Sequence, residues 1–209
     1  MLKVATNKTR RSIVVFIRGL PGAGKTFLAQ KLQKEIGDNC LVLDPDGIKN
    51  HSLEYQLFIK DLARREPHLS PKFFPYRFLR NQALIHLKKG GLVIWDQPWS
   101  NLNGLKVTIE YLTKNLSQAP LVIIVELEIA PDKAYQRIRK RIESGGHGPS
   151  RTTFLQFVNR FRSVITSQYF ENILVIKLDA TNISKQTINR LKTIITCGKQ
   201  NLPNSSSSN

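Results

Sequence analysis

The 209-residue sequence is poor in sulfur: it contains two cysteines, Cys40 and Cys197, and one methionine. The two cysteines show neither a metal-binding nor a redox spacing, which argues against a cysteine-based metal centre. We expect both to be reduced and buried, as in cytosolic proteins, with a disulfide between them as the alternative.

Long hydrophobic runs are also missing. No stretch reaches the roughly 18 apolar residues that a membrane span needs. Arg10 and Arg11, followed by the apolar run Ile13 to Ile17, superficially resemble a signal peptide, but this run is short and leads directly into a glycine-rich motif. We therefore expect a cytoplasmic protein without membrane contacts. With 209 residues, 41% of them hydrophobic, the chain can form one domain with a sizeable core.

Acidic residues are scarce. Fifteen Asp and Glu face thirty-two Lys and Arg, which gives a net charge of +17. A field of this sign attracts anions, including nucleic acids. The basic residues are scattered, however, and no run of them is long enough to form a basic arm. We interpret the charge as a solvated basic surface, with a nucleic-acid partner as the alternative.

One motif dominates the sequence: Gly19-Leu20-Pro21-Gly22-Ala23-Gly24-Lys25-Thr26 matches the phosphate-loop pattern G-x-x-x-x-G-K-[ST]. Its glycines let several backbone N–H groups point at one anion. Lys25 can reach the β- and γ-phosphates of a nucleotide, and the Thr26 hydroxyl can bind Mg²⁺. The residues expected to contact the nucleotide are Gly19, Leu20, Pro21, Gly22, Ala23, Gly24, Lys25, Thr26 and Phe27.

The segments around this motif have the pattern that it requires. Ile13 to Ile17 is typical of a buried parallel strand. Thr26 to Ile36 is typical of a helix, with its apolar positions at Phe27, Leu28, Leu32 and Ile36. Lys25 is expected to face solvent when no nucleotide is bound, so that its substitution would leave the core intact.

Carboxylates follow two further predicted strands. Asp96 ends the apolar run Leu92 to Trp95, where phosphate-loop proteins place an acid that holds Mg²⁺ directly or through water. A cap of the strand end is the alternative role. Asp44 and Asp46 follow the predicted strand Cys40 to Leu43. A carboxylate at this place can accept the proton of an acceptor hydroxyl, although Asp-Pro-Asp-Gly is also a good turn sequence.

A basic helix and a glycine-rich loop form the third candidate. Arg137 and Arg141 are four residues apart, so they share one face of the helix predicted over 131–143. The loop from Ser144 to Pro149 suits a mobile lid that closes over phosphates. A solvated basic face is the alternative, and we do not expect the lone His147 to be catalytic.

Strands and helices alternate along the rest of the chain. Further strands are predicted at 121–127 and 173–178, and further helices at 53–65, 75–89, 102–116, 184–195 and from Thr152 or Thr153 to Arg162. This alternation indicates an α/β fold with a five-stranded parallel sheet. We expect a loose basic leader at 1–11, one domain at 12–197 with a lid near 137–151, and a disordered tail at 198–209.

Three segments together resemble the zeta-toxin-like group of small P-loop kinases, which belongs to a broader set sometimes labelled AAA-type ATPases. They are the phosphate loop, the stretch Asp44 to Lys49, and Arg137 to His147, where two arginines four apart precede Gly-Gly-His. Phe157 and the pair Arg160-Phe161 match a later element of the same pattern. The resemblance implies a three-layer P-loop NTPase fold with helices flanking the sheet, and ATP and Mg²⁺ as cofactors.

The resemblance also implies residue roles. The implied catalytic residues are Lys25, Asp46, Arg137 and Arg141, and the implied metal ligands are Thr26 and Asp96. Asp46 matches the family's acid better than Asp44 does, because it lies three residues before a basic residue. That basic residue is Lys49, where the family usually has arginine.

The predicted function is transfer of the γ-phosphoryl group of ATP to a hydroxyl of a small molecule. One alternative is a polynucleotide 5′-hydroxyl kinase, which the positive charge would suit. The other is a non-catalytic nucleotide-binding switch that binds a partner such as RNA. The carboxylates after the second predicted strand favour a kinase, because a switch needs no carboxylate facing an acceptor pocket.

Overall fold

The computed structural model describes residues 11–171 and 173–197. The predicted basic leader, apart from Arg11, and the predicted tail at 198–209 lie outside these residues. Within the described part of the chain, no helix is long and apolar enough to cross a membrane.

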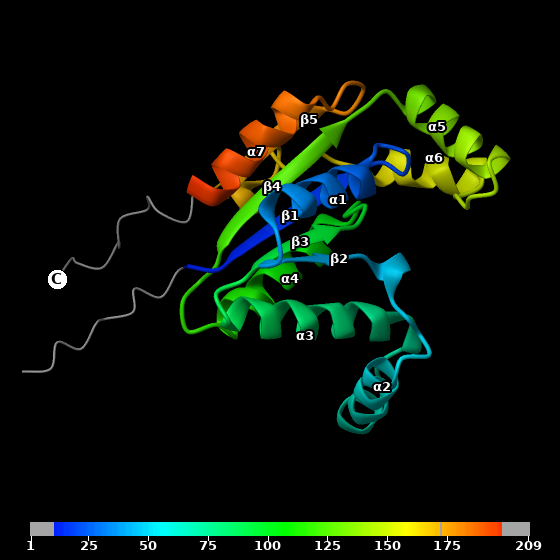
Figure 1. Cartoon of the computed structure of the whole chain (residues 1–209). Coiled ribbons are helices and arrows are strands. Elements are labelled where there is room, and N and C mark those ends of the chain that lie inside the picture. Colours follow the sequence, from blue (N-terminus) through cyan, green and yellow to red (C-terminus); the bar gives the residue numbers. More distant parts are fainter. Residues whose placement is uncertain (1–10, 172, 198–209) are drawn as a thin grey trace, which may run out of the picture.

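Five strands form a single parallel sheet in the order β2-β3-β1-β4-β5 (Figure 1). Their bounds are β1 Ile13–Gly19, β2 Cys40–Leu43, β3 Leu92–Asp96, β4 Leu121–Glu128 and β5 Leu174–Asp179. The predicted fold class is therefore confirmed. The central strand β1 is buried along its whole length, which explains why its sequence is almost continuously apolar.

The described residues contain seven α-helices, of which six lie between strands and the last follows β5. Their bounds are α1 Lys25–Ile36, α2 Leu53–Arg65, α3 Phe74–Lys88, α4 Leu102–Lys114, α5 Pro131–Glu143, α6 Arg151–Arg160 and α7 Lys185–Cys197. The predicted ranges agree with these to within two residues at most ends. The start of α6 differs, because Ser150 caps this helix by accepting a hydrogen bond from the Thr153 backbone N–H at 3.2 Å.

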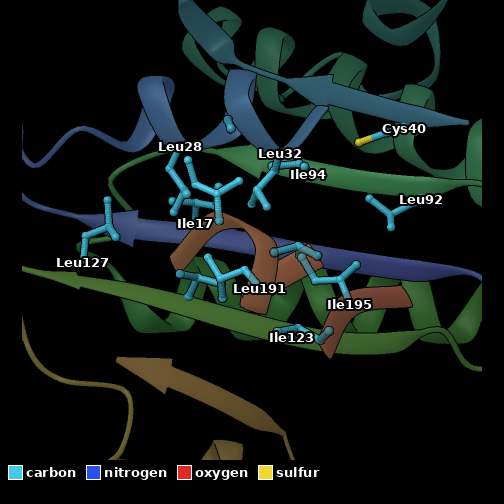
Figure 2. Close-up of a cluster of buried hydrophobic side chains, with 14 of the residues drawn as sticks. Ile17, Leu28, Leu32, Cys40, Leu92, Ile94, Ile123, Leu127, Leu191 and Ile195 are labelled. Carbon is cyan, nitrogen blue, oxygen red and sulfur yellow. The ribbon is translucent and has the colours of Figure 1, made fainter. Parts of the chain in front are cut away.

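Helices cover both faces of the sheet, so the domain has three layers (Figure 1). On one face, alternate residues of β1 such as Ile13 and Ile17 pack against α1 and α7, through Leu28, Leu32 and Leu191 among others (Figure 2). On the other face, α3 and α4 contribute side chains to a second core that includes Val14 and Phe16 of β1. The period-two alternation along β1 thus supplies both cores.

Two parts of the chain project beyond the carboxyl edge of the sheet (Figure 1). One is α2, and the other consists of α5, α6 and the loop between them, a segment that contains the predicted lid at 137–151. A small separate core of Leu20, Ala134, Ile138 and Phe154 joins α5 and α6 to the loop after β1. The base of the lid is therefore packed against the phosphate loop.

No disulfide joins Cys40 and Cys197. Cys40 is buried at the start of β2, as expected. The expectation that Cys197 is buried was wrong. The buried face of α7 consists of Ile188, Leu191 and Ile195, and Cys197 lies two residues further on, outside that stripe.

Candidate active site

The phosphate loop connects β1 to α1 with two glycines in the left-handed backbone region. Gly22 has φ 83° and Gly24 has φ 91°, values that residues with a Cβ atom rarely adopt. Gly24 is also the residue before the first turn of α1. The free N–H groups of that turn therefore open toward the loop, where an anion can bind.

Lys25 is buried, with 8% of its surface exposed, so the expectation that it faces solvent was wrong. Its ammonium group donates hydrogen bonds to the carbonyl oxygens of Gly19 at 3.2 Å and Leu20 at 3.0 Å. Burial lowers the pKa of Lys25 to about 8, opposed by Asp96 and assisted by the positive charge of Arg141. The amine folds back onto the loop because a buried ammonium must find acceptors nearby.

A cavity of about 920 Å³ lies at the carboxyl edge of the sheet and brings most of the predicted site residues together. Of the predicted nucleotide contacts, those that line it are Pro21, Gly22, Gly24, Lys25, Thr26 and Phe27. Gly19, Leu20 and Ala23 do not line it. Leu20 and Ala23 belong to the hydrophobic cores beneath, and Gly19 accepts the hydrogen bond of Lys25.

Asp96 and Thr26 lie together on the wall of this cavity. Asp96 is the last residue of β3 and is almost fully buried. Burial raises the pKa of its carboxyl group, while a hydrogen bond with the Thr26 side chain and the charge of Lys25 oppose that rise. A hydroxyl and a carboxylate in contact fit Mg²⁺, which binds oxygen and often takes only one or two protein ligands.

The two carboxylates after β2 have different surroundings, although both line the cavity. Asp44 caps the short turn Pro45–Gly47, and its Oδ1 accepts the Asp46 backbone N–H at 2.9 Å. Burial raises the pKa of Asp44, partly offset by that hydrogen bond. Asp46 is exposed, and its carboxylate has no hydrogen bond within the described residues. The turn interpretation therefore applies to Asp44 and leaves the carboxylate of Asp46 available.

The lid residues reach the same cavity. Arg137, Arg141 and His147 all line it, and all three are exposed. The Arg137 guanidinium donates to the Thr181 carbonyl at 3.4 Å. His147, which we did not expect to be catalytic, lies close enough for its charge to act on Asp44.

The lid helix is also in direct contact with the phosphate loop. A Cβ atom at Gly22 would lie 2.3 Å from the carbonyl oxygen of Ala134 in α5, so only glycine fits there. The position of α5 and the shape of the loop therefore depend on each other.

The lining of the cavity also includes residues that the sequence analysis missed. They come from α3, from the turn before it and from the β3–α4 region: Phe73, Tyr76, Arg80, Trp99, Asn101 and Thr108. Trp99 has φ 49°, the one positive φ of a non-glycine residue in the described chain. Such strain is typical of functional sites. The four-residue spacing of Tyr76 and Arg80 on one helix face was the available signal.

The parallel sheet, the glycine loop between β1 and α1, and the acid at the end of β3 define a P-loop NTPase fold. The family model described as an AAA domain matches residues 14–164, and the chain belongs to this family. The resemblance to small P-loop kinases is thereby confirmed. No curated protein matches the chain.

Three solved structures show the same fold. A gluconokinase from Sinorhizobium meliloti has a TM-score of 0.55 and 11% identity, covering 91% of this chain and 95% of that one. Kti12 from Chaetomium thermophilum, in complex with ADP-AlF3, has a TM-score of 0.59 and 14% identity, covering 90% of this chain and 100% of that one. A structure of the PezAT toxin–antitoxin system of Streptococcus pneumoniae has a TM-score of 0.54 and 15% identity, covering 91% of this chain and 87% of that one.

Proposed function

We propose that this protein transfers the γ-phosphoryl group of ATP to a hydroxyl group of a small molecule. One observation carries the proposal: a single cavity is lined by the phosphate loop, a carboxylate without a hydrogen-bond partner among the described residues, and two arginines of the lid. A phosphate donor, a group that orients a hydroxyl and charges that stabilise the transferring phosphoryl are the requirements of this reaction.

The phosphate loop binds the donor. The N–H groups at the start of α1 surround the β-phosphate, and Lys25 exchanges the carbonyl groups of Gly19 and Leu20 for phosphate oxygens. Thr26 and Asp96 would hold Mg²⁺, which neutralises charge on the β- and γ-phosphates when it is bound. ADP-AlF3 in the similar Kti12 structure supports a nucleotide at this loop.

Asp46 acts on the acceptor. Its carboxylate accepts a hydrogen bond from the acceptor hydroxyl, orients the oxygen toward the γ-phosphorus and takes the proton late in the transfer. Asp44 fixes the backbone of Asp46 through their hydrogen bond. Arg137 and Arg141 supply positive charge to the transferring group when the lid closes, which keeps water out of the site.

The polynucleotide 5′-hydroxyl kinase is a second candidate, favoured by the charge of the lid. Between Pro131 and Arg162 the chain has eight Lys or Arg residues and two acidic residues. A surface of this charge attracts a phosphate backbone. The small-molecule acceptor remains the first proposal, because the cavity that holds both substrates is only about 920 Å³.

Transfer of label from γ-labelled ATP to a panel of sugars, nucleosides and 5′-hydroxyl oligonucleotides tests the proposal. We expect one class of hydroxyl compound to be labelled, and Lys25→Ala to abolish the labelling. Thermal unfolding of this variant is the control, since Lys25 is buried. A wild-type protein that binds ATP but labels no acceptor would support the nucleotide-binding switch. A Lys25→Ala variant with full activity would overturn the assignment of the loop.

A further inference from the structure

Arg80 of α3 lines the cavity and is a cation held in a fixed orientation. Its Nε and Nη2 donate hydrogen bonds to Thr108 Oγ1 at 3.1 and 2.8 Å. Thr108 is buried, and its hydroxyl donates in turn to the Gly104 carbonyl at 2.9 Å. The guanidinium carbon also lies 6.0 Å from the Tyr111 ring centroid. Three residues of α4 thus fix one charged group of α3.

The part of the Arg80 guanidinium that Thr108 does not use is a fork suited to an oxyanion. Of its five N–H donors, the Nε group and one Nη2 group serve Thr108, which leaves both N–H groups of Nη1 and one of Nη2. Nη1, which donates no hydrogen bond within the described residues, does not belong to their buried unpartnered atoms, so it is accessible. A carboxylate or phosphate can therefore reach this fork and accept two parallel hydrogen bonds.

No acidic side chain of the described residues neutralises Arg80. It forms no ion pair with a carboxylate there, whereas its neighbour Arg77 pairs with Glu66 at 2.9 Å. Burial lowers the pKa of Arg80, and the positive charge of Arg77 lowers it further. A partly desolvated cation without a counter-ion is costly, and an anionic ligand would offset that cost.

Ring surfaces and unpaired polar atoms belong to the lining of the same cavity. Phe73 and Tyr76 line the same cavity and keep much of their surface exposed. Trp99 Nε1 and Gln97 Oε1, from two more residues of the lining, are buried without a hydrogen-bond partner. A donor and an acceptor left unsatisfied at the wall of a cavity favour a polar ligand that supplies both partners.

We propose that the acceptor substrate carries its own anionic group, a phosphate or a carboxylate, and that the Nη1–Nη2 fork of Arg80 binds it. The inference rests on the proposed kinase function and names the class of its substrate: a cyclic hydroxyl compound whose ring lies against Tyr76 and Phe73. The acceptor oxygen forms a bond to the γ-phosphorus, and the bond to ADP breaks. The hydroxyl proton passes to Asp46. A phosphate-bearing acceptor therefore leaves as a bisphosphate.

Matched acceptor pairs that differ only in the anionic group test this inference. The pairs are glucose with glucose 6-phosphate, glucose with glucuronate, and adenosine with adenosine 3′-monophosphate; a 5′-hydroxyl oligonucleotide is compared with the adenosine pair. We expect an anionic member to have the higher kcat/KM. Arg80→Met should lower that value by about tenfold to 100-fold, as for a charge-assisted hydrogen bond, and leave the neutral member unchanged.

Two variants serve as controls. Arg77→Met removes a charge from the next turn of the same helix, outside the cavity, and should leave the preference intact. Arg80→Lys keeps the charge but loses the planar fork, so it should retain part of the preference and remain informative if Arg80→Met does not fold. Equal losses for neutral and anionic acceptors in Arg80→Met, or a wild-type preference for neutral acceptors, would overturn the inference.

A binding measurement separates this inference from the kinase proposal. The protein is first saturated with Mg²⁺ and a non-hydrolysable ATP analogue, so that added phosphate groups cannot occupy the phosphate loop. The same compounds are then titrated by calorimetry. Binding of an anionic compound that depends on Arg80, without any transfer from ATP, would refute the kinase and support the anion site. No such binding by any anionic compound would refute the anion site.

Discussion

Arg18 and Glu126 form a fully buried ion pair that joins β1 to β4 one residue before the phosphate loop. Arg18 Nη2 also donates to the carbonyl oxygens of Trp99 at 3.2 Å and Arg162 at 2.8 Å. Glu126 accepts the Ser163 hydroxyl at 2.8 Å and the Val164 N–H at 3.0 Å. One ion pair thus ties together the loop after β3, the segment after the lid and the central strand.

We predict that Arg18→Met lowers the free energy of unfolding by about 3–5 kcal/mol, because it leaves the carboxylate of Glu126 buried without its partner. Urea denaturation measures the change. The double variant Arg18→Met with Glu126→Gln should be less destabilised than the sum of the single variants, since the glutamine oxygen still accepts from Ser163 and Val164. Additive losses would mean that the two charges do not stabilise each other.

The lowered pKa of Lys25 predicts how the free energy of unfolding changes with pH in the nucleotide-free protein. Its pKa is about 8 in the folded protein and about 10.5 as the ordinary value, so the unfolded chain binds more protons between these limits. The burial penalty is fully present below pH 8 and disappears as the pH rises to 10.5. The contribution of Lys25 to the free energy of unfolding should therefore increase by about 3 kcal/mol across this window.

The measurement is the difference in unfolding free energy between wild type and Lys25→Met at pH 7 and at the highest pH that both proteins tolerate. Subtraction removes the titration of other groups, which both proteins share. The unfolding free energy of the wild type should increase relative to that of the variant as the pH rises. A constant difference would show that Lys25 has an ordinary pKa when folded.

Asp46→Asn should keep ATP affinity within about threefold and lower acceptor phosphorylation by about 10²–10⁴, the range for a lost general base. The asparagine keeps the size of the side chain but cannot take the proton. Asp44→Asn is the matched control and should lose less, since its oxygen still accepts the Asp46 backbone N–H. A fluorescent ATP analogue and a transfer assay on the same preparations measure both quantities. A larger loss of acceptor phosphorylation in Asp44→Asn than in Asp46→Asn would mean that Asp44, and not Asp46, is the general base.

Arg137→Ala and Arg141→Ala should each lower kcat by about 10²-fold or more, by analogy with other arginines that stabilise phosphoryl transfer. Arg139→Ala is the control on the same helix. Arg139 does not line the cavity, and its guanidinium lies 3.4 Å from Glu143 on the exposed surface. Steady-state kinetics at saturating ATP distinguish the three. Similar, small effects in all of them would mean that this face of α5 is only a solvated basic surface.

The features that could be predicted from the sequence depend on local patterns. The phosphate loop is contiguous, and Asp96 directly follows an apolar strand, so both were found where the structure has them. The parallel sheet followed from the alternation of strands and helices. Arg137 and Arg141 were found because their helical spacing precedes a glycine-rich loop.

The features that were missed depend on contacts between distant segments. Arg80 and Thr108 are 28 residues apart and meet only because α3 and α4 pack on the same face of the sheet. No spacing within α3 indicates that a threonine of α4 will orient this arginine. The pKa of Lys25 depends likewise on charges from distant segments, Asp96 of β3 and Arg141 of α5, in addition to its burial.

The contact between Gly22 and Ala134 has a thermodynamic consequence. If a nucleotide in the loop and an acceptor beneath the lid favour the same position of α5, each strengthens the binding of the other by the same factor, because coupling free energy between two sites is reciprocal. The coupling needs no relay through the sheet, since one glycine and one backbone carbonyl connect the two halves of the site. The total free energy of binding both substrates is then the same whichever of them binds first.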